Sequence, residues 1–351
     1  MKTNLFGTFF IFLISVTAFA QVGSSIDEGE YISIGGIEQW VTIKGSDRTK
    51  PAILFLHGGP GSVMSPYDEA IYGQWEKDFI LVNWDQRGAG RTFGKNAPAE
   101  LNEDYWIENP LTIEQMTSDG IELSEHLLKH LGKQKIILIG TSWGSVLGVS
   151  MSQNRPDLFY AYVGHSQVVN SSESEINAYQ KLLKMAETTN DQTSLEKLKS
   201  LGSPPYEDAK NTGQFYRVIK KFESENSVPA PDSWWKISKE YDNEIDGQNR
   251  YDGDDYSFIN FAGHKKLGIK SMVAGLDFMK DAVNFDIPVY LIQGEEDIIT
   301  PKEISRVYFD KITAPKKEFF LVQGAAHGHN QSIIDIQFKI AKEKIALFIK
   351  E

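Results

Sequence analysis

Short apolar runs recur along the chain and predict buried β-strands. The runs show almost no polar alternation, which is typical of strands that are covered on both faces of a parallel sheet. Residues 31–45 instead alternate around Gly35-Gly36 and predict a β-hairpin. The apolar runs occupy residues 52–56, 79–84, 136–139, 160–164, 288–293 and 318–322.

Helical patterns separate the apolar runs. Thr112, with Gln115 three residues later, forms a capping box, and the helix that begins there ends at Gly132. Two further helices are expected at residues 303–311 and 333–350. Strands that alternate with helices in this way predict an α/β fold with a mostly parallel sheet and crossover helices on both faces.

Residues 168–281 interrupt this alternation. Strand-like runs disappear there, and charged segments with helical spacing replace them. We therefore predict a catalytic domain made of residues 21–167 and 282–351, with residues 168–281 inserted as a helical lid over the carboxyl edge of the sheet. The lid is expected to be helical at residues 176–185, 215–222 and 234–241, with a solvated acidic loop at 246–255.

A Gly-x-Ser-x-Gly sequence follows the apolar run at residues 136–139. It comprises Gly140 to Gly144, and small and apolar residues then continue at helical spacing. The segment therefore predicts a strand, a sharp turn and a helix, which is the context that a nucleophile elbow requires. Because such a turn exposes its serine above the sheet, Ser142 is the predicted nucleophile.

A serine hydroxyl is a weak nucleophile, so it needs a base and an acid that orients the base. In folds with this elbow, the acid and then the histidine follow the serine along the chain. Asp297 lies just after the apolar run at 288–293, and His327 just after that at 318–322. Both therefore lie past strand ends and are expected to meet Ser142 at one edge of the sheet.

Each partner has a rival in its own loop. Glu295 and Glu296 precede Asp297, which is preferred because two more residues let the chain turn back after the strand. His329 is the rival of His327, and a His-x-His pair is also compatible with a metal site. No third cluster with metal-ligand spacing is visible, so we predict neither a metal ion nor another cofactor.

Acyl transfer places negative charge on the carbonyl oxygen, so backbone donors are needed to form an oxyanion hole. The N–H of Trp143, directly after the nucleophile, is the first expected donor. The second is expected from the His-Gly-Gly-Pro-Gly loop at residues 57–61, whose glycines allow a close approach to substrate. Pro60 has no N–H, so Gly59 is the predicted donor there.

Together these segments resemble the prolyl iminopeptidase family, serine peptidases of the α/β-hydrolase fold that remove N-terminal residues, proline especially. The resemblance covers about residues 30–168 and 282–350. It implies Ser142, Asp297 and His327 as the catalytic triad, with Gly59 and Trp143 as the oxyanion hole. We interpret Arg87 and its neighbours as structural residues that brace the loop under the site. The matching segments are residues 57–61, 84–91, 140–145, 294–297 and 324–327.

The lid departs from the family pattern. Members that act on proline hold the substrate amine with lid glutamates near a Trp-x-x-Trp-Glu sequence, whereas this chain has Trp234-Trp235 followed by lysine. Glu240 and Glu244 are candidate partners for an ammonium group, which needs carboxylates when it leaves water. Trp234 and Trp235 are candidates for walling a small side chain, and the alternative is that both acids only solvate a helix.

The first twenty residues have the character of a secretory signal peptide: a basic start, a short apolar segment and Ala18-Phe19-Ala20 before Gln21. The apolar segment is shorter than the ~20 residues of a spanning helix. We therefore expect cleavage after Ala20 and a periplasmic or secreted protein without stable membrane insertion. The chain has no Cys, which excludes disulfides and thiol catalysis.

The formal net charge of −12 argues against a nucleic-acid partner, because phosphates require a basic surface. The leading hypothesis is an exported serine hydrolase of the prolyl aminopeptidase type, which releases N-terminal residues from short peptides through an acyl-enzyme on Ser142. One alternative is a carboxylesterase or lactonase with the same triad. Another is a small-ligand binding protein or sensor on a hydrolase fold. An aspartate nucleophile, as in epoxide hydrolases, is excluded at position 142.

Overall fold

The computed structural model describes residues 24–98 and 100–349, so the predicted signal peptide lies outside the described residues. Its centre is an eight-stranded sheet in the order β1-β2-β4-β3-β5-β6-β7-β8. β1 and β2 form the predicted hairpin and β2 pairs with β4 antiparallel, whereas the remaining pairs are parallel. The strands are β1 Ile26–Ile34, β2 Ile37–Gly45, β3 Ala52–Leu56, β4 Ile80–Trp84, β5 Ile136–Thr141, β6 Phe159–His165, β7 Val289–Gly294 and β8 Lys317–Val322.

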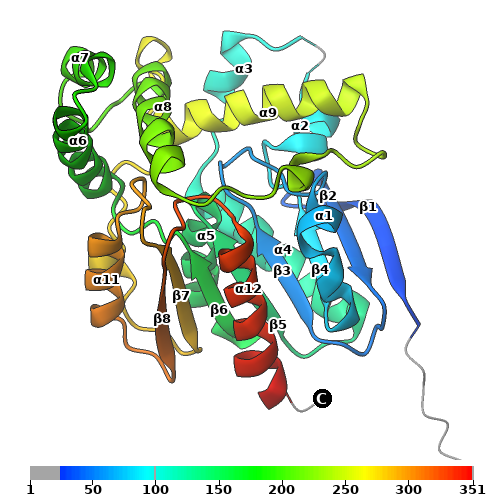
Figure 1. Cartoon of the computed structure of the whole chain (residues 1–351). Helices are drawn as coiled ribbons and strands as arrows, with labels where there is room; N and C mark the ends of the chain where they lie inside the picture. The colour runs from blue at the N-terminus through cyan, green and yellow to red at the C-terminus, as the bar shows by residue number, and fades with distance from the viewer. Residues whose placement is uncertain (1–23, 99, 350–351) are drawn as a thin grey trace, which may run out of the picture.

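Helices cover both faces of this sheet. In Figure 1, α1 and α12 lie in front of it and α4 and α5 lie behind it. The capping box is present, because the Thr112 side chain accepts the N–H of Gln115, and α4 ends at the left-handed Gly132. The helices of the body are α1 Asp68–Tyr72, α2 Gly90–Asn96, α3 Glu103–Glu108, α4 Ile113–Leu131, α5 Trp143–Asn154, α11 Lys302–Lys311 and α12 Gln331–Lys339.

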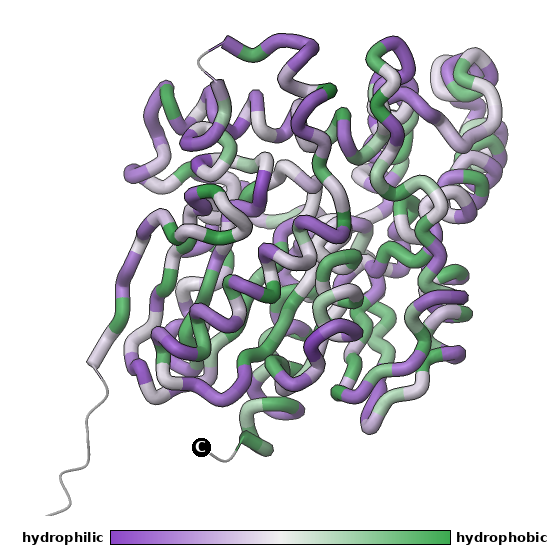
Figure 2. The backbone as a smooth tube through the Cα atoms, turned by 180° about the vertical axis from the view of Figure 1, so that it is seen from behind, coloured by the Kyte–Doolittle hydropathy of each residue, from purple (hydrophilic) through white to green (hydrophobic). Residues whose placement is uncertain are grey.

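Two apolar layers sandwich the sheet because its central strands direct alternate side chains to opposite faces. In β3, Leu54 joins the layer under α4 and α5, and Phe55 joins the layer under α1 and α12. Both are buried, as the unbroken apolar run predicts. Figure 2 shows long apolar stretches in the sheet and mixed colouring on the helices.

Between β6 and β7 the chain is helical and lies above the carboxyl ends of the strands (Figure 1). These helices form a small apolar core of their own, which Ile298 from the loop after β7 joins. The lid contains α6 Ser171–Thr188, α7 Gln192–Leu201, α8 Ala209–Asn226, η3 Asp232–Trp235, α9 Glu244–Ala262, η4 Lys265–Leu267 and α10 Phe278–Asp281.

Three local predictions need correction. Residues 246–255 are helical, because they belong to α9, which Asn243 caps and whose Tyr256 and Ile259 are buried. Residues 234–241 form no α-helix beyond the short η3, whose Trp234 is buried. The helix expected to run from 333 to 350 ends as α12 at Lys339, and a π-helical turn at Ile340–Ile345 and a 3₁₀ turn at Ala346–Phe348 follow it.

Candidate active site

The turn between β5 and α5 holds Ser142 in a conformation that few side chains adopt. Its φ is 53° and its ψ is −120°, a region that costs conformational energy for any residue other than glycine. The flanking glycines are required by close packing. A Cβ on Gly140 would lie 2.4 Å from the carbonyl oxygen of Gly144, and one on Gly144 would lie 2.0 Å from that of Leu56. The strained turn therefore presents the serine hydroxyl above the sheet.

The structure brings Ser142, His327 and Asp297 together from three strand ends. His327 Nε2 lies 2.8 Å from Ser142 Oγ, and His327 Nδ1 lies 3.1 and 3.2 Å from the carboxylate oxygens of Asp297. Thr300 fixes that carboxylate by donating its N–H at 2.8 Å and its hydroxyl at 2.6 Å. With Nδ1–H donating to Asp297, Nε2 is left as the acceptor that faces the serine hydroxyl.

The surroundings of Asp297 and His327 shift the pKa values of both groups. Burial opposes the charged form of each group, but their mutual attraction, together with the Thr300 hydrogen bonds to Asp297, outweighs that cost. The pKa of Asp297 is therefore lowered below its ordinary value, and the pKa of His327 is raised above 6.5. Because its pKa is lowered although it is fully buried, Asp297 remains an anion that orients the imidazole and stabilises its protonated form.

The rival residues occupy other positions. His329 Nε2 lies 3.3 Å from the Tyr72 hydroxyl and 3.4 Å from Thr141 Oγ1. Burial, together with the neighbouring His327, lowers the pKa of His329 to about 4. Glu295 forms an ion pair with Lys302 at 3.6 Å, and the Glu296 N–H donates to the carbonyl oxygen of Ala325. None of these side chains is bonded to Ser142 in the described structure.

A hydrogen-bond network braces the loop that contains Gly59. Buried His57 donates from Nδ1 to the Gly58 carbonyl at 2.8 Å and accepts the Gln86 N–H on Nε2 at 3.2 Å. The Gln86 side chain in turn accepts the Trp143 indole N–H at 3.0 Å. The network thus connects the loops on either side of the nucleophile, and burial lowers the pKa of His57 to about 4, which keeps it neutral.

The loop lies directly against the nucleophile. A Cβ on Gly58 would be 3.3 Å from the Cβ of Ser142. Trp143 is the first residue of α5, so its N–H has no acceptor within that helix, and among the described residues the Gly59 N–H has no backbone acceptor. Both are therefore available as hydrogen-bond donors beside Ser142.

Arg87, in the segment between β4 and α2, contacts two other parts of the body. Its Nε donates to Asp119 on α4 at 2.7 Å, and its terminal nitrogen donates to the carbonyl oxygen of Gly35 in the hairpin turn at 2.8 Å. The side chain therefore ties the β1–β2 hairpin to a body helix and does not line the cavity around Ser142.

A cavity of about 630 Å³ lies between Ser142 and the lid. Its floor contains Gly58, Ser142 and His327, and residues of α6, α8 and α9 line it from the lid side. Trp235 lines it too, with its ring 5.8 Å from that of Tyr67. Trp234 is buried instead and does not line it.

The structure does not bring Glu240 and Glu244 to this cavity. Glu240 pairs with Arg91 at 2.6 Å on the edge of the body, and Glu244 is exposed in the first turn of α9. The expected helix through Glu240 is absent, so the two acids do not share a helix face. Their assignment as cavity residues is corrected here: the acids that line the cavity are Glu175 and Asp254.

A third acid, Glu223 on α8, lies behind the triad. It is buried, and its carboxylate accepts the N–H of Ile298, the residue after Asp297, at 2.7 Å. Burial and the nearby charge of Asp297 raise the pKa of Glu223 to about 7. This residue was not predicted from the sequence, although Ile219 and Phe222 beside it indicate a helix face that packs inward.

The residues that the structure describes meet the requirements of neither a metal site nor a membrane-spanning helix. Among residues 24–98 and 100–349, no three His, Asp or Glu side chains come together in an arrangement that could hold a metal ion. No helix in this part of the chain combines the length and apolar character needed to cross a membrane.

Comparison with known proteins places the chain in a family. A family model for the alpha/beta hydrolase fold matches residues 51–329. The chain is 31% identical over 297 residues to the probable aminopeptidase YbaC of Bacillus subtilis (strain 168), covering 84% of this chain and 89% of the relative. It is 25% identical over 299 residues to a proline iminopeptidase of Clostridioides difficile (strain 630), covering 84% and 90%.

A solved structure agrees at the level of the fold. The proline iminopeptidase of Mycobacterium smegmatis superposes with a TM-score of 0.59 at 16% identity, over 92% of this chain and 97% of that one. The segment that the family model matches, residues 51–329, includes the nucleophile elbow and the loops after β7 and β8. The chain therefore belongs to the α/β-hydrolase fold family and is a hydrolase of the group that includes the proline iminopeptidases.

Proposed function

We propose that the protein is a serine aminopeptidase that releases N-terminal residues from short peptides through an acyl-enzyme on Ser142. The observation that carries this proposal is the chain of contacts from Ser142 through His327 to Asp297, on the floor of a cavity that the lid covers. A covered cavity favours short, flexible substrates because a folded chain cannot enter it.

Each group has a defined role in the proposed reaction. Ser142 Oγ attacks the scissile carbonyl while His327 Nε2 takes its proton, and buried Asp297 stabilises the imidazolium. The N–H groups of Gly59 and Trp143 stabilise the oxyanion of the tetrahedral intermediate. His327 then returns the proton to the leaving amine, and water that His327 activates hydrolyses the ester on Ser142.

Recognition of a free amine requires carboxylates in the cavity. Glu175 and Asp254 line it, and Asp254 accepts a hydrogen bond from the Ser62 hydroxyl at 3.1 Å. Arg217 and Lys220 also line the cavity. A ligand in the cavity therefore meets both acidic and basic side chains. The names of the relatives, a probable aminopeptidase and a proline iminopeptidase, support the same reaction class.

The test compares an aminoacyl-naphthylamide with its N-acetylated twin, alongside acyl nitrophenyl esters. A strong preference for the free amine is expected, because an ammonium without water needs a carboxylate partner. Ser142→Ala serves as the control for background hydrolysis. Equal turnover of both twins, with faster turnover of plain esters, would reject the aminopeptidase function in favour of a carboxylesterase or lactonase.

The proposal includes export of the protein. It is supported by the basic start, apolar segment and small residues before Gln21. The protein recovered outside the cytoplasm is expected to have Gln21 as its first residue, and N-terminal sequencing tests this. Recovery of the uncleaved chain from the cytoplasm alone would contradict it.

A further inference from the structure

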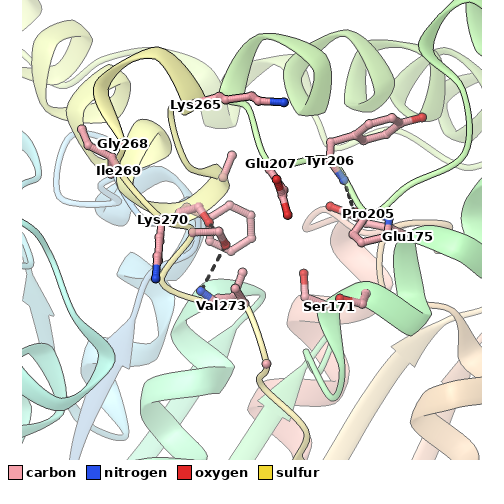
Figure 3. A pocket seen from close by; sticks show the side chains of 16 residues that line it. Ser171, Glu175, Pro205, Tyr206, Glu207, Lys265, Gly268, Ile269, Lys270 and Val273 are labelled. Atoms are coloured by element: carbon pink, nitrogen blue, oxygen red, sulfur yellow. Dashed lines mark hydrogen bonds between the residues drawn. The ribbon is translucent and has the colours of Figure 1, made fainter.

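A second cavity adjoins the one that contains Ser142. It measures about 430 Å³ and lies in the lid, between the start of α6, the end of α9 and the loop that follows η4 (Figure 3). Ser171, Glu175 and Phe261 line both cavities. The two spaces are therefore neighbours that share a wall, and the wall contains one of the two acids of the substrate cavity.

The second cavity and the loop of His327 lie toward opposite faces of the sheet. Phe261 and Val273, which line it, belong to the apolar layer on the α4 and α5 face of the sheet. His329, in the loop of His327, contacts Tyr72 in the layer on the opposite face. We infer that the leaving group, which receives its proton from His327, lies on that opposite side and that the acyl group extends toward the second cavity.

Glu175 is the charged group at the junction. It lies one helical turn above Ser171, about 6 Å further along the helix axis. Its carboxylate accepts the N–H of Tyr206 at 3.4 Å, and within the described residues it has no ion pair with a cation. Burial raises its pKa to about 7, as expected for a carboxylate that lacks a charged partner.

Other charged groups line the second cavity. Figure 3 shows Glu207 pointing toward Ser171 across the space, with Lys265 above and Lys270 extending away from Glu207. Neither lysine forms an ion pair with Glu175 in the described structure. The junction therefore holds a carboxyl group without a cationic partner, and binding an ammonium group there would favour its ionised form.

We propose that the second cavity completes the acyl-binding site and takes an N-terminal dipeptide, with its free ammonium held by Glu175. The inference rests on the proposed aminopeptidase function and specifies its acyl group. A single residue holds its ammonium next to the scissile carbonyl, whereas a dipeptide carries it about 3.5 Å further. The longer acyl group thus extends further from Ser142, toward the wall where Glu175 lines both cavities.

The bonds that change are those of the triad reaction. Ser142 Oγ bonds to the carbonyl carbon of the second residue, and the C–N bond to the leaving amine breaks. His327 transfers the serine proton to that amine. Water then cleaves the ester and releases a free dipeptide.

The experiment uses the full protein with three substrates: Ala-naphthylamide, Ala-Ala-naphthylamide and N-acetyl-Ala-Ala-naphthylamide. Mass spectrometry of early products is expected to show intact Ala-Ala from the free dipeptidyl substrate. Its kcat/KM is expected to exceed that of the acetylated twin by about 10- to 100-fold, because a charge-assisted contact is lost on capping.

Variants assign this preference to Glu175. Glu175→Gln is expected to remove most of the discrimination between free and acetylated dipeptidyl substrates, and Glu175→Asp to restore part of it. Glu173→Gln is the matched control, because Glu173 is exposed on the same helix and lines neither cavity. Fluorophosphonate labelling of Ser142 in each variant shows that the site is folded.

Two results would overturn the inference while leaving the aminopeptidase function in place. One is release of free alanine before any naphthylamine from Ala-Ala-naphthylamide, which means removal of single residues. The other is unchanged discrimination in Glu175→Gln. Failure of every free-amine substrate would instead reject the aminopeptidase function, and this inference with it.

Discussion

The body and the lid hold their site residues in different ways. In the body, the backbone of neighbouring strands sets the positions: the Ser142 N–H donates to the carbonyl oxygen of His165, and that of Glu295 to the carbonyl oxygen of Val322, each at 3.0 Å. In the lid, side chains reach across the fold. Glu223 binds the N–H of a residue 75 positions away.

The lid also supports the loops of the body. After α8, the Val228 N–H donates to the carbonyl oxygen of Gly324, and Asn330 donates to that of Val228 at 3.1 Å. Glu223 holds the other loop through Ile298. The end of α8 and the residues after it thus contact both the loop of Asp297 and the loop of His327. The lid therefore helps to position the triad as well as covering it.

The largest effect is expected in the body. Ser142→Ala should lose about 10⁴- to 10⁶-fold in kcat, because the nucleophile is removed while the rest of the site stays in place. A fluorophosphonate should label wild type at Ser142 and leave the variant unlabelled. An adduct mapped to a different serine would refute the assignment of the nucleophile.

Substitutions of the two histidines in the loop after β8 should differ nearly as much in their effect on activity. His327→Ala should resemble the serine variant, because His327 contacts Ser142 Oγ at 2.8 Å. His329→Ala should lose less than about tenfold, since a histidine outside the proton path contributes no acid–base catalysis. Steady-state kinetics of both variants make the comparison, and the reverse order of severity would mean that His329 is the base.

Glu223 connects the two regions, and its charge should appear in the pH profile. The base must be neutral, so activity is lost as pH falls through the pKa of His327, which Asp297 and Glu223 raise and Lys220 opposes. Glu223→Gln removes a negative charge that favours protonated His327. The acid limb of kcat/KM should therefore move to lower pH, with little change on the alkaline plateau, because glutamine still accepts the Ile298 N–H.

Two controls separate charge from structure in that measurement. Glu225→Gln, an exposed position on the same helix, should leave the profile unchanged. Glu223→Ala should lower the plateau as well, because the acceptor for Ile298 is lost. An unmoved acid limb in Glu223→Gln would show that the charge of Glu223 does not reach the base.

The smallest effects concern the seam where α9 meets the body. Arg91 forms two contacts of 2.9 Å with Asp246 and one of 2.6 Å with exposed Glu240. Asp246→Asn should cost about 2 kcal/mol of unfolding free energy, as for hydrogen bonds between charged groups. Glu240→Gln should cost less than about 0.5 kcal/mol, because exposed pairs contribute little. Urea unfolding measures both, and equal losses would contradict this ranking.

The sequence by itself determined the strands of the body and the three residues that meet at their carboxyl ends. Unbroken apolar runs identified the central strands, and the glycines around Ser142 identified the turn, because a tight turn tolerates no Cβ at those positions. Asp297 and His327 followed from their places just past strand ends. The signal was local in each case: a few consecutive residues specify a backbone path that the sheet then fixes.

Only the tertiary structure decided the lid. Acids are common there, and the sequence favoured Glu240 and Glu244 over Glu175, Asp254 and Glu223. The choice depends on which helix faces meet the cavity and on partners more than seventy positions away, such as Ile298 for Glu223 and Arg91 for Glu240. The sequence does not distinguish an exposed acid from a buried one. Packing alone decides which carboxylate is removed from water.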